Sequence, residues 1–314
     1  MGDIMATDKQ EFNFDLTILG GGPAGLSAGI YGARGEVSTA IIDISMLGGQ
    51  PTNYLEIENY PAYAMSGGYE LMEKFEEHAD KFNVKKFPME NVLSVNLKDK
   101  IIETEDKIFK SKAMILCTGA KARKLNIPGE KEFAGRGVSY CAVCDGAFFK
   151  NKVICVIGGG NSAIEEAIYL TKFASKVYII HRRDELRADK IIQQRAFKNP
   201  QIEFVYNSIP LEIVGENTVT SIIIKNVKTN QVKEIKTSGV FPYIGFSANN
   251  ELFNGEVEQD ANGFIVTNEK METSVKGVYA AGDVRTTPLR QVITAASDGA
   301  VAATYAIKYL EELE

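Results

Sequence analysis

The 314-residue sequence contains only four cysteines, two histidines and no tryptophan. Four cysteines at irregular positions are too few for the disulfide framework of a small secreted domain. No segment comes near the roughly 18 consecutive apolar residues of a membrane span. The first apolar run, at positions 16–19, is too short for the core of a signal peptide. We therefore expect a cytoplasmic protein with no membrane partner.

An excess of positive charge is missing as well. Lysine and arginine together number 35 and aspartate and glutamate 41, which gives a formal net charge of −6. A mildly acidic surface does not attract the phosphate backbone of a nucleic acid or an anionic lipid surface, so neither is an expected partner. At about 100–200 residues per domain, the length predicts about two domains.

What the sequence does contain is an internal repeat at an offset of 138 residues. Residues 15–22 (DLTILGGG) align with residues 153–160 (VICVIGGG), and residues 30–31 and 41–42 align with 168–169 and 179–180. Each copy reads as a strand, a glycine turn, a helix and a second strand, which is the βαβ unit of nucleotide-binding folds. We expect an α/β fold with two Rossmann-like, three-layer ββα domains.

A meander of short strands is expected within each domain. Alternating apolar residues predict strands at 101–102, 108–109 and 114–116, and again over 220–240 around a turn at 226–231. An apolar stripe at helical spacing over 66–82 predicts an amphipathic helix there.

The first copy of the repeat carries Gly20-x-Gly22-x-x-Gly25, followed by Asp43 at the end of the second strand. The glycines permit a tight turn, a close approach of a pyrophosphate and close packing of helix on strand. A carboxylate about 20 residues further on accepts hydrogen bonds from ribose hydroxyls. This copy is therefore expected to bind an unphosphorylated adenosine, as in FAD or NAD.

The second copy has His181 where the first has Asp43, and Arg182, Arg183 and Arg187 follow. Guanidinium groups match the geometry and charge of a phosphate, whereas a carboxylate would repel it. A solvated run of charges is the alternative, but its place at the ribose-binding end of a βαβ unit favours a 2′-phosphate site. The second copy is therefore expected to bind NADPH.

Cys141 and Cys144 form a CxxC motif just ahead of the second nucleotide-binding strand. Structural zinc would need four ligands, and the other cysteines and histidines are scattered. Two inert buried cysteines are a second possibility, although Asp145 and Gly146 make the segment turn-like. A dithiol that cycles with its disulfide is favoured, with the adjacent carboxylate moving protons. A flavin in the first copy would then link NADPH to the disulfide.

With these motifs in place, the chain resembles the low-molecular-weight thioredoxin reductases over essentially its whole length. The most specific block is residues 139–146 (SYCAVCDG), and supporting blocks are residues 20–25, 48–50, 58–61, 158–166, 181–187, 281–283 and 290–291. The resemblance implies FAD, NADPH, thioredoxin as partner and a homodimer. It also implies that one domain is inserted into the other, with residues 1–119 and 248–314 binding FAD and residues 120–247 binding NADPH.

The resemblance also implies roles for individual residues. FAD is expected at Gly20, Gly22, Pro23, Ala24, Asp43, Gly49, Gln50, Asn59, Gly282, Asp283, Arg290, Gln291 and Val292. NADPH is expected at Gly158, Gly160, Asn161, Ser162, Glu165, His181, Arg182, Arg183, Arg187 and Gly245. By the same resemblance Cys144 faces the flavin, Cys141 attacks thioredoxin and Asp145 is the acid/base, although the residues alone leave the order of the two sulfurs open. No metal is expected.

Some features depart from the family pattern, and other functions compete. Ala62 stands where the family commonly has glycine, and Cys117 replaces a small residue, so we expect Cys117 and Cys155 to be buried filler. Rotation of the inserted domain about glycine hinges is expected between half-reactions. The alternatives are the same chemistry on a peroxiredoxin or glutaredoxin-like partner, and a nucleotide-binding redox sensor without turnover.

Overall fold

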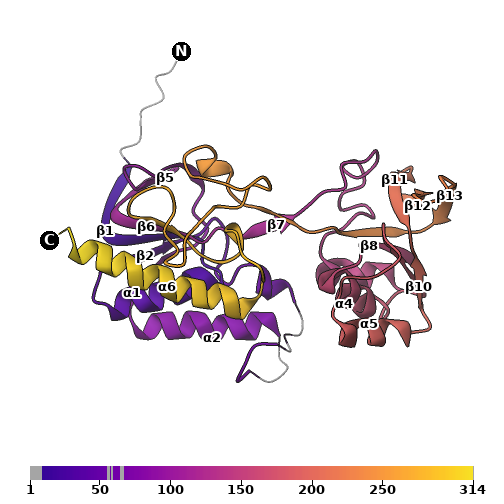
Figure 1. The fold of residues 1–314 in the computed structure, drawn as a ribbon, viewed down its shortest axis with the longest axis horizontal. Coiled ribbons are helices and arrows are strands. Elements are labelled where there is room, and N and C mark those ends of the chain that lie inside the picture. The colour runs from indigo at the N-terminus through magenta and orange to yellow at the C-terminus, as the bar shows by residue number, and fades with distance from the viewer. Residues whose placement is uncertain (1–8, 55–56, 58, 64–66, 314) are drawn as a thin grey trace, which may run out of the picture. The chain divides into compact units, whose positions relative to one another are not determined.

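The computed structural model describes residues 9–54, 57, 59–63 and 67–313. The chain divides into two compact units, one of Met1–Lys121 with Ser247–Glu314 and one of Ala122–Phe246 (Figure 1). Each unit contains a sheet with adjacent parallel strands and with helices packed on it, so the expected α/β class is confirmed. Among the described residues, no helix is long and apolar enough to cross a membrane.

The first unit is built on a seven-stranded sheet in the order β3-β2-β1-β6-β5-β4, with β16 also paired to β6. Its strands are β1 (Gln10–Leu19), β2 (Thr39–Ile42), β3 (Lys85–Phe87), β4 (Val92–Asn96), β5 (Ile101–Thr104), β6 (Lys107–Leu116) and β16 (Val278–Ala280). β4, β5 and β6 form an antiparallel meander, and the other pairs are parallel. The strands expected at 108–109 and 114–116 are one continuous strand, β6, because it pairs with β1 along almost its whole length.

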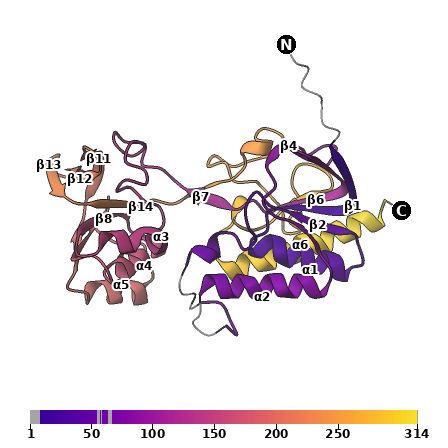
Figure 2. The same ribbon diagram turned by 180° about the vertical axis from the view of Figure 1, so that it is seen from behind.

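Three helices cover one face of this sheet, α1 (Pro23–Arg34), α2 (Gly68–Lys81) and α6 (Val292–Glu311), as Figure 2 shows. Short 3₁₀ turns lie at Gln50–Asn53, Glu251–Phe253 and Gly282–Val284. α1 and α6 are in backbone contact, because a Cβ atom at Gly299 would lie 2.0 Å from the carbonyl oxygen of Ala24. The C-terminal helix is thereby fixed against the helix that follows the first glycine turn.

The second unit has a four-stranded parallel sheet in the order β10-β9-β8-β14 and an antiparallel sheet in the order β11-β12-β13. The strands are β8 (Val153–Gly158), β9 (Lys176–Ile180), β10 (Ile202–Val205), β11 (Ser208–Gly215), β12 (Val219–Asn226), β13 (Val232–Lys236) and β14 (Gly239–Tyr243). The helices are α3 (Ala142–Asp145), α4 (Asn161–Leu170) and α5 (Lys190–Phe197), with a 3₁₀ turn at Gly146–Phe149. The expected strands around the turn at 226–231 are β12 and β13, whereas β11 was not predicted.

The side chains of β8 alternate between two cores, as the period of a strand requires. Ile154 and Val156 pack with α3, α4 and α5, while Cys155 and Ile157 pack against Ile222 and other residues of the antiparallel sheet. The parallel sheet is therefore the middle layer of a ββα sandwich, which explains why β8 reads as a continuous apolar run.

The predicted repeat is confirmed without a gap. Adding 138 to the first residue of α1 gives the first residue of α4, and adding 138 to the bounds of β2 gives residues 177–180 within β9. In both units the first strand pairs in parallel with the second.

The chain crosses between the units on two short paired strands, β7 (Ala120–Ala122) and β15 (Phe246–Ala248). On one side of this pair, the hydroxyl of Thr118 donates to the carbonyl of Asn249 (2.6 Å) and the amide of Asn249 donates to Gly119 (3.0 Å). On the other side, the amide of Arg123 donates to the carbonyl of Gly245 (2.9 Å).

Gly299→Ala tests the contact between α1 and α6. In an open helix this change would stabilise by about 1 kcal/mol, but here the new methyl group would collide with backbone. We expect a loss of about 2 kcal/mol or more in the free energy of unfolding, measured by urea titration. Ser297→Ala, at an exposed position of the same helix, is the control and should change it by less than about 0.5 kcal/mol. An unfolding curve for Gly299→Ala equal to that of the wild type would contradict the contact.

Candidate functional site

The first glycine turn joins β1 to α1 and leaves no room for a side chain at Gly20 or Gly25. Gly20 has a φ of 107°, and a Cβ atom there would lie 2.3 Å from the carbonyl oxygen of Cys117. A Cβ atom at Gly25 would lie 1.8 Å from the carbonyl oxygen of Gly20. At Gly22 the nearest atoms would be backbone of Gly48 and Gly49 at 3.8–3.9 Å, so space remains beside the turn. The start of α1, with Pro23 as its first residue, can therefore receive a phosphate group on its free amides.

Asp43 follows β2 and faces this turn. Its Oδ2 atom accepts from the amide of Gly21 (2.5 Å), and its Oδ1 atom accepts from the amide and hydroxyl of Ser45 (2.8 and 2.9 Å). The residue is buried, so these bonds fix the carboxylate in place. Two carboxylate oxygens offer about four lone-pair directions, which leaves capacity for a ribose hydroxyl. Ser45 lies in the stretch from Asp43 to Gln50 that the resemblance assigns to FAD, but no motif singled it out as a partner of Asp43.

Residues expected at one site from distant parts of the sequence lie together around this turn. A Cβ atom at Gly49 would lie 3.0 Å from Cα of Gly22, and one at Gly282 would lie 3.0 Å from Cβ of Ala24. The side-chain amide of Asn59 donates to Oε1 of Gln291, which is the N-cap residue of α6 (3.0 Å).

Two more of these expected residues, Gln50 and Val292, have partners within the first unit. Gln50 donates from its side-chain amide to the carbonyl of Ala120. Val292, the first residue of α6, packs on the apolar cluster of Ile57, Leu71 and Met72. Glu58, which belongs to one motif of the resemblance, lies outside the described residues.

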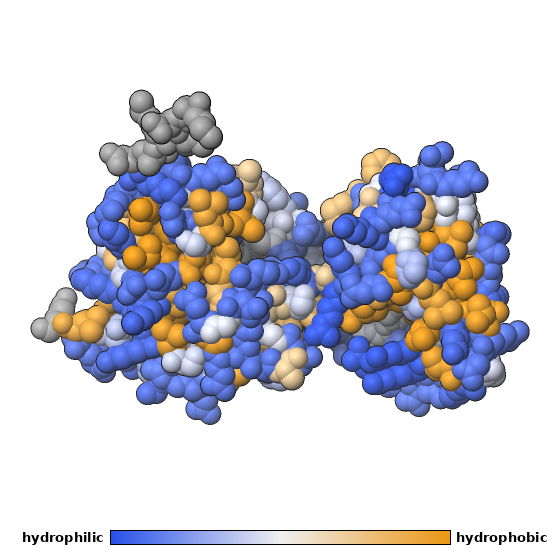
Figure 3. All heavy atoms as spheres, turned by 90° about the horizontal axis from the view of Figure 1, so that it is seen from above, coloured by the Kyte–Doolittle hydropathy of each residue, from blue (hydrophilic) through white to orange (hydrophobic). Residues whose placement is uncertain are grey.

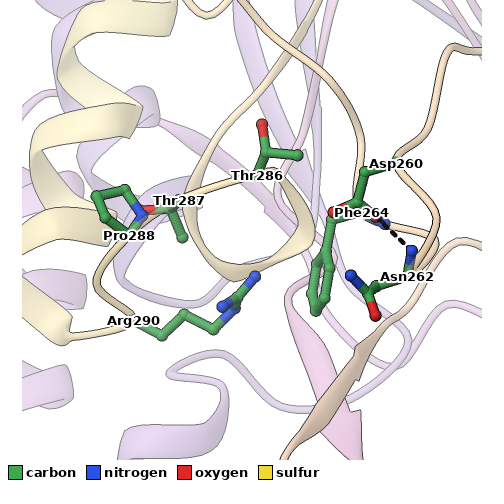
Figure 4. Close-up of a pocket in the computed structure, with 7 residues that line it drawn as sticks. All are labelled: Asp260, Asn262, Phe264, Thr286, Thr287, Pro288 and Arg290. Atoms are coloured by element: carbon green, nitrogen blue, oxygen red, sulfur yellow. Dashed lines mark hydrogen bonds between the residues drawn. The ribbon is translucent and has the colours of Figure 1, made fainter.

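Asp283 and Arg290 form the charged part of this region. Burial raises the pKa of Asp283 to about 6, with Arg290 opposing and the nearby charge of Asp298 adding to the shift. No hydrogen bond from a described residue reaches the Asp283 carboxylate. The guanidinium of Arg290 lies 4.0 Å above the ring of Phe264 (Figure 4), and its buried Nε has no partner in the described chain. Phe264 was not predicted.

Asp298 and Arg285 hold the turn that carries Asp283, and neither was predicted. The amide of Gly282 donates to Oδ2 of Asp298 (3.2 Å), and Arg285 pairs with the same oxygen at 3.0 Å. Both side chains are largely buried, at 13% and 14% exposure, so the ion pair is little screened by solvent. Arg285 also donates from Nε to the hydroxyl of Thr267 (2.7 Å).

The second glycine turn, after β8, repeats this construction. A Cβ atom at Gly158 would lie 2.3 Å from the carbonyl oxygen of Tyr243, and one at Gly159 would lie 2.5 Å from the ring of His181. A Cβ atom at Gly160 would meet nothing within 4 Å, so one side of the turn is open. The amide of Arg187 donates to the carbonyl of Gly159 (2.7 Å), which brings the arginine segment back to the turn.

At the position that corresponds to Asp43, the second unit has a buried histidine that is followed by arginines. His181 is buried, its Nε2 lies 3.0 Å from the carbonyl of Glu185, and burial together with the adjacent arginines lowers its pKa. Arg182, Arg183 and Arg187 are exposed, and within the described chain none of the three forms an ion pair. Three unpaired guanidinium groups beside an open turn fit a phosphate.

The remaining residues expected at the second turn are distributed as follows. Asn161, the first residue of α4, exchanges hydrogen bonds with Asp189, while Ser162 and Glu165 lie further along the same helix. Gly245 lies at the crossing, where its carbonyl accepts from the amide of Arg123 (2.9 Å).

Cys141 and Cys144 form a disulfide at the one-turn helix α3. The amide of Cys144 donates to Sγ of Cys141 (3.1 Å), and Cys144 is exposed. Asp145 ends the helix and is half-buried.

On the face drawn in Figure 3, hydrophilic side chains cover much of both units. Phe148, just after the disulfide, is 73% exposed, a high value for a large apolar side chain.

The other two cysteines are buried free thiols, as expected for filler. Burial raises the pKa of Cys155 to about 12 and raises that of Cys117 further. Neither forms the thiolate that redox chemistry requires near neutral pH. Within the part of the chain that the structure describes, no three His, Cys, Asp or Glu residues are grouped to hold a metal ion.

Two nucleotide-type glycine turns and an exposed disulfide in the unit with the arginine cluster define a nucleotide-dependent disulfide oxidoreductase. The model of the family described as pyridine nucleotide-disulphide oxidoreductase matches residues 14–299, and the chain belongs to this family. Members of this family related to this chain use FAD and NADPH.

Named relatives narrow the resemblance. The chain is 46% identical to thioredoxin reductase of Peptoclostridium acidaminophilum over 307 residues, covering 95% of this chain and 97% of that protein. It is 45% identical to thioredoxin reductase of Bacillus subtilis (strain 168) over 308 residues, covering 98% of each. The crystal structure of Lactococcus lactis thioredoxin reductase has a TM-score of 0.92 and 47% identity, covering 95% of this chain and 99% of that one. The similarity to thioredoxin reductases expected from the sequence is therefore confirmed.

Asp283→Asn tests the burial of that carboxyl in the FAD-free protein. Because the folded-state pKa lies near 6 and the ordinary value is 3.8, the folded protein binds the proton more tightly, and stability falls as pH rises between these values. At 1.4 kcal/mol per pKa unit, we expect wild type to lose about 2 kcal/mol from pH 4 to pH 6 relative to Asp283→Asn. Urea unfolding at each pH measures this difference.

Two features make the comparison specific. Glu166, whose pKa burial raises to about 7, titrates in both proteins and cancels from the difference. Asp260→Asn is the control, because the pKa of Asp260 is lowered and its effect falls below the same pH range. Parallel stability curves for wild type and Asp283→Asn would show that Asp283 titrates normally.

Proposed function

We propose that the chain is a cytoplasmic, NADPH-dependent thioredoxin reductase that acts through FAD and the Cys141–Cys144 disulfide. The observation that carries this proposal is the exposed disulfide in the same unit as an open glycine turn with three unpaired arginines. The names of several similar proteins support thioredoxin as the disulfide substrate. A homodimer is part of the proposal and rests on the resemblance.

The residues of the first unit fit FAD. The open side of Gly22 and the free amides of α1 suit a pyrophosphate, and the oriented carboxylate of Asp43 suits an adenosine ribose. The unpaired carboxylate of Asp283 suits sugar-alcohol hydroxyls, and the buried, unpartnered Nε of Arg290 suits a carbonyl or phosphate oxygen. We assign FAD to residues 1–119 with 248–314, at the thirteen positions expected from the sequence.

The residues of the second unit fit NADPH. The open side of Gly160 admits phosphate to the start of α4, and Arg182, Arg183 and Arg187 would bind a 2′-phosphate. The ring of His181 packs directly against Gly159 and supports the turn, so the charge that binds the 2′-phosphate would come from the arginines. We assign NADPH to residues 120–247, at the ten positions expected from the sequence.

In the proposed reaction the Cys141–Cys144 bond accepts two electrons and two protons and opens to a dithiol. When bound, FAD supplies the step that passes the electron pair from the nicotinamide to this disulfide. Asp145, next to Cys144, delivers a proton to the departing thiolate. Cys141 then attacks the disulfide of thioredoxin, Cys144 closes on Cys141, and thioredoxin leaves with two thiols.

The proposal includes rotation of the inserted unit between half-reactions. Its nucleotide turn and its disulfide must each reach one flavin, and both belong to the same unit. Gly119 and Gly245, with φ of 69° and 111°, flank the crossing strands, and a Cβ atom at Gly119 would meet nothing within 4 Å. Left-handed glycines with free space can absorb the backbone change of a hinge.

Anaerobic titration with NADPH tests the proposal. Wild-type protein purified with FAD should take up four electrons, two at the flavin and two at the disulfide, whereas Cys141→Ser and Cys144→Ser should each take up about two. Wild type should then oxidise NADPH continuously only when thioredoxin is added, followed by absorbance at 340 nm.

The other outcomes separate the alternatives. Turnover with a peroxiredoxin or glutaredoxin-like protein but not with thioredoxin would mean that this protein, and not thioredoxin, is the substrate. Uptake of four electrons without turnover on any of these proteins would indicate a redox sensor. Equal electron uptake by wild type and both serine variants would exclude a redox-active disulfide.

Replacing both Arg182 and Arg183 by alanine tests the 2′-phosphate site. Charge-assisted bonds to a phosphate are lost, so kcat/KM for NADPH should fall about 100-fold while that for NADH stays within about twofold. Arg136→Ala is the control and should change neither value, because Arg136 is an exposed arginine of the same unit that donates to backbone carbonyls and lies over the ring of Phe133. Equal losses with NADPH and NADH would mean that the cluster does not read the 2′-phosphate.

A further inference from the structure

Tyr243, the last residue of β14, contacts the helix that carries the disulfide. Its hydroxyl oxygen accepts a hydrogen bond from the amide of Ala142 at 3.0 Å. Ala142 is the first residue of α3 and lies between the two cysteines. No motif in the sequence pointed to Tyr243, which is a hundred residues away along the chain.

This hydrogen bond holds a buried group. Ala142 is 1% exposed, so its amide has no access to water and would be left unsatisfied without the tyrosine oxygen. The other contacts that hold the segment include the bond from the amide of Asp145 to the carbonyl of Cys141 (3.2 Å), the bond from the amide of Cys141 to the hydroxyl of Ser139 (3.1 Å), the bond from the amide of Cys144 to Sγ of Cys141, and the disulfide itself. Two of these depend on sulfur atoms whose bonding changes on reduction.

The tyrosine is anchored independently of the cysteines. Tyr243 is the register partner of Gly158 where β14 pairs with β8. Its carbonyl oxygen packs so closely on that glycine that a Cβ atom there would lie 2.3 Å from it. Its ring packs on the core that β8 shares with α4. None of these contacts involves Cys141 or Cys144, so the anchoring of the tyrosine does not depend on the S–S bond.

We propose that Tyr243 is a positioning residue that stabilises the dithiol form of Cys141 and Cys144. In the oxidised protein the S–S bond holds α3 in place whether or not this hydrogen bond forms, so the bond contributes only the energy of satisfying the buried amide of Ala142. In the reduced protein the covalent tie is gone, and the Tyr243–Ala142 bond keeps the two thiols in place for reoxidation. The hydroxyl therefore makes the disulfide easier to reduce. This inference deepens the proposed function, because it rests on cycling of the same two cysteines.

The test is the redox equilibrium of the FAD-bound protein with dithiothreitol. The Cys141–Cys144 bond takes two electrons and two protons from the two thiols of dithiothreitol, which closes to its cyclic disulfide. Samples are equilibrated at set ratios of reduced to oxidised reagent, quenched with acid and alkylated, and the dithiol fraction is read by mass spectrometry. The variants are Tyr243→Phe and the control Tyr140→Phe.

Tyr140 is the matched control because it adjoins Cys141 but its hydroxyl donates to Glu130 (2.7 Å) and accepts no hydrogen bond from α3 in the described chain. For Tyr243→Phe we expect the dithiol-to-disulfide ratio to fall about fivefold, the effect of losing one hydrogen bond. That ratio corresponds to a potential about 20 mV more negative. Tyr140→Phe should match wild type, and unchanged FAD content and circular dichroism would verify the fold of both variants.

Each outcome decides the inference. A ratio for Tyr243→Phe within twofold of wild type, or higher than wild type, would overturn it, and so would an equal fall in Tyr140→Phe. The dithiothreitol equilibrium does not involve NADPH or thioredoxin. A wild type that equilibrates with dithiothreitol but fails to oxidise NADPH with thioredoxin would therefore refute the proposed function without touching the role of Tyr243.

Discussion

Contact between backbone atoms, with no side chain between them, determines how this protein is assembled. The carbonyl oxygen of Gly20 packs directly on the backbone of Gly25, so α1 starts in contact with the strand before it. The carbonyl of Ala24 closes on Gly299, which brings α6 against α1. Through α6 the ion pair of Arg285 and Asp298 then holds the turn of Gly282 beside the same helix start. A ligand at that helix start would therefore meet groups from both ends of the chain at positions set by rigid packing.

The two units use one architecture with opposite charge. In the first, Asp43 is the oriented anion beside the glycine turn, and its oxygens are held by Gly21 and Ser45. In the second, the corresponding position is a buried His181 that supports the turn with its ring, and the charge lies on exposed arginines. A phosphate can be bound by side chains that solvent reaches, whereas a carboxylate that accepts from neutral hydroxyls gains more from burial and fixed geometry.

The sequence was sufficient for the features that local patterns encode. The repeat at 138 residues, the glycine turns and the CxxC motif depend on short spacings, and the structure places them on the predicted strands and helices. Contacts between distant residues without a motif were not predictable. Phe264 under Arg290 and Tyr243 beside Ala142 are of this kind.

The first and last residues of a strand were also hard to predict, because they depend on partner strands that are distant in the sequence. β6 is continuous because β1 pairs along it, and its own sequence reads as separate pieces. Ala62 has a φ of 63°, the left-handed conformation that glycine adopts without cost, which explains why glycine is common at this position in the family but not why alanine stands here.

The paired strands at the crossing also explain how such a chain can contain one unit within another. Seen from the first unit, everything between β7 and β15 occupies the place of a surface loop whose two ends are already neighbours. The entropy of closing a loop rises only with the logarithm of its length, and an insert that folds on itself adds little even to that. A second copy of the βαβ unit could thus enter at this point during evolution without disturbing the core it interrupts.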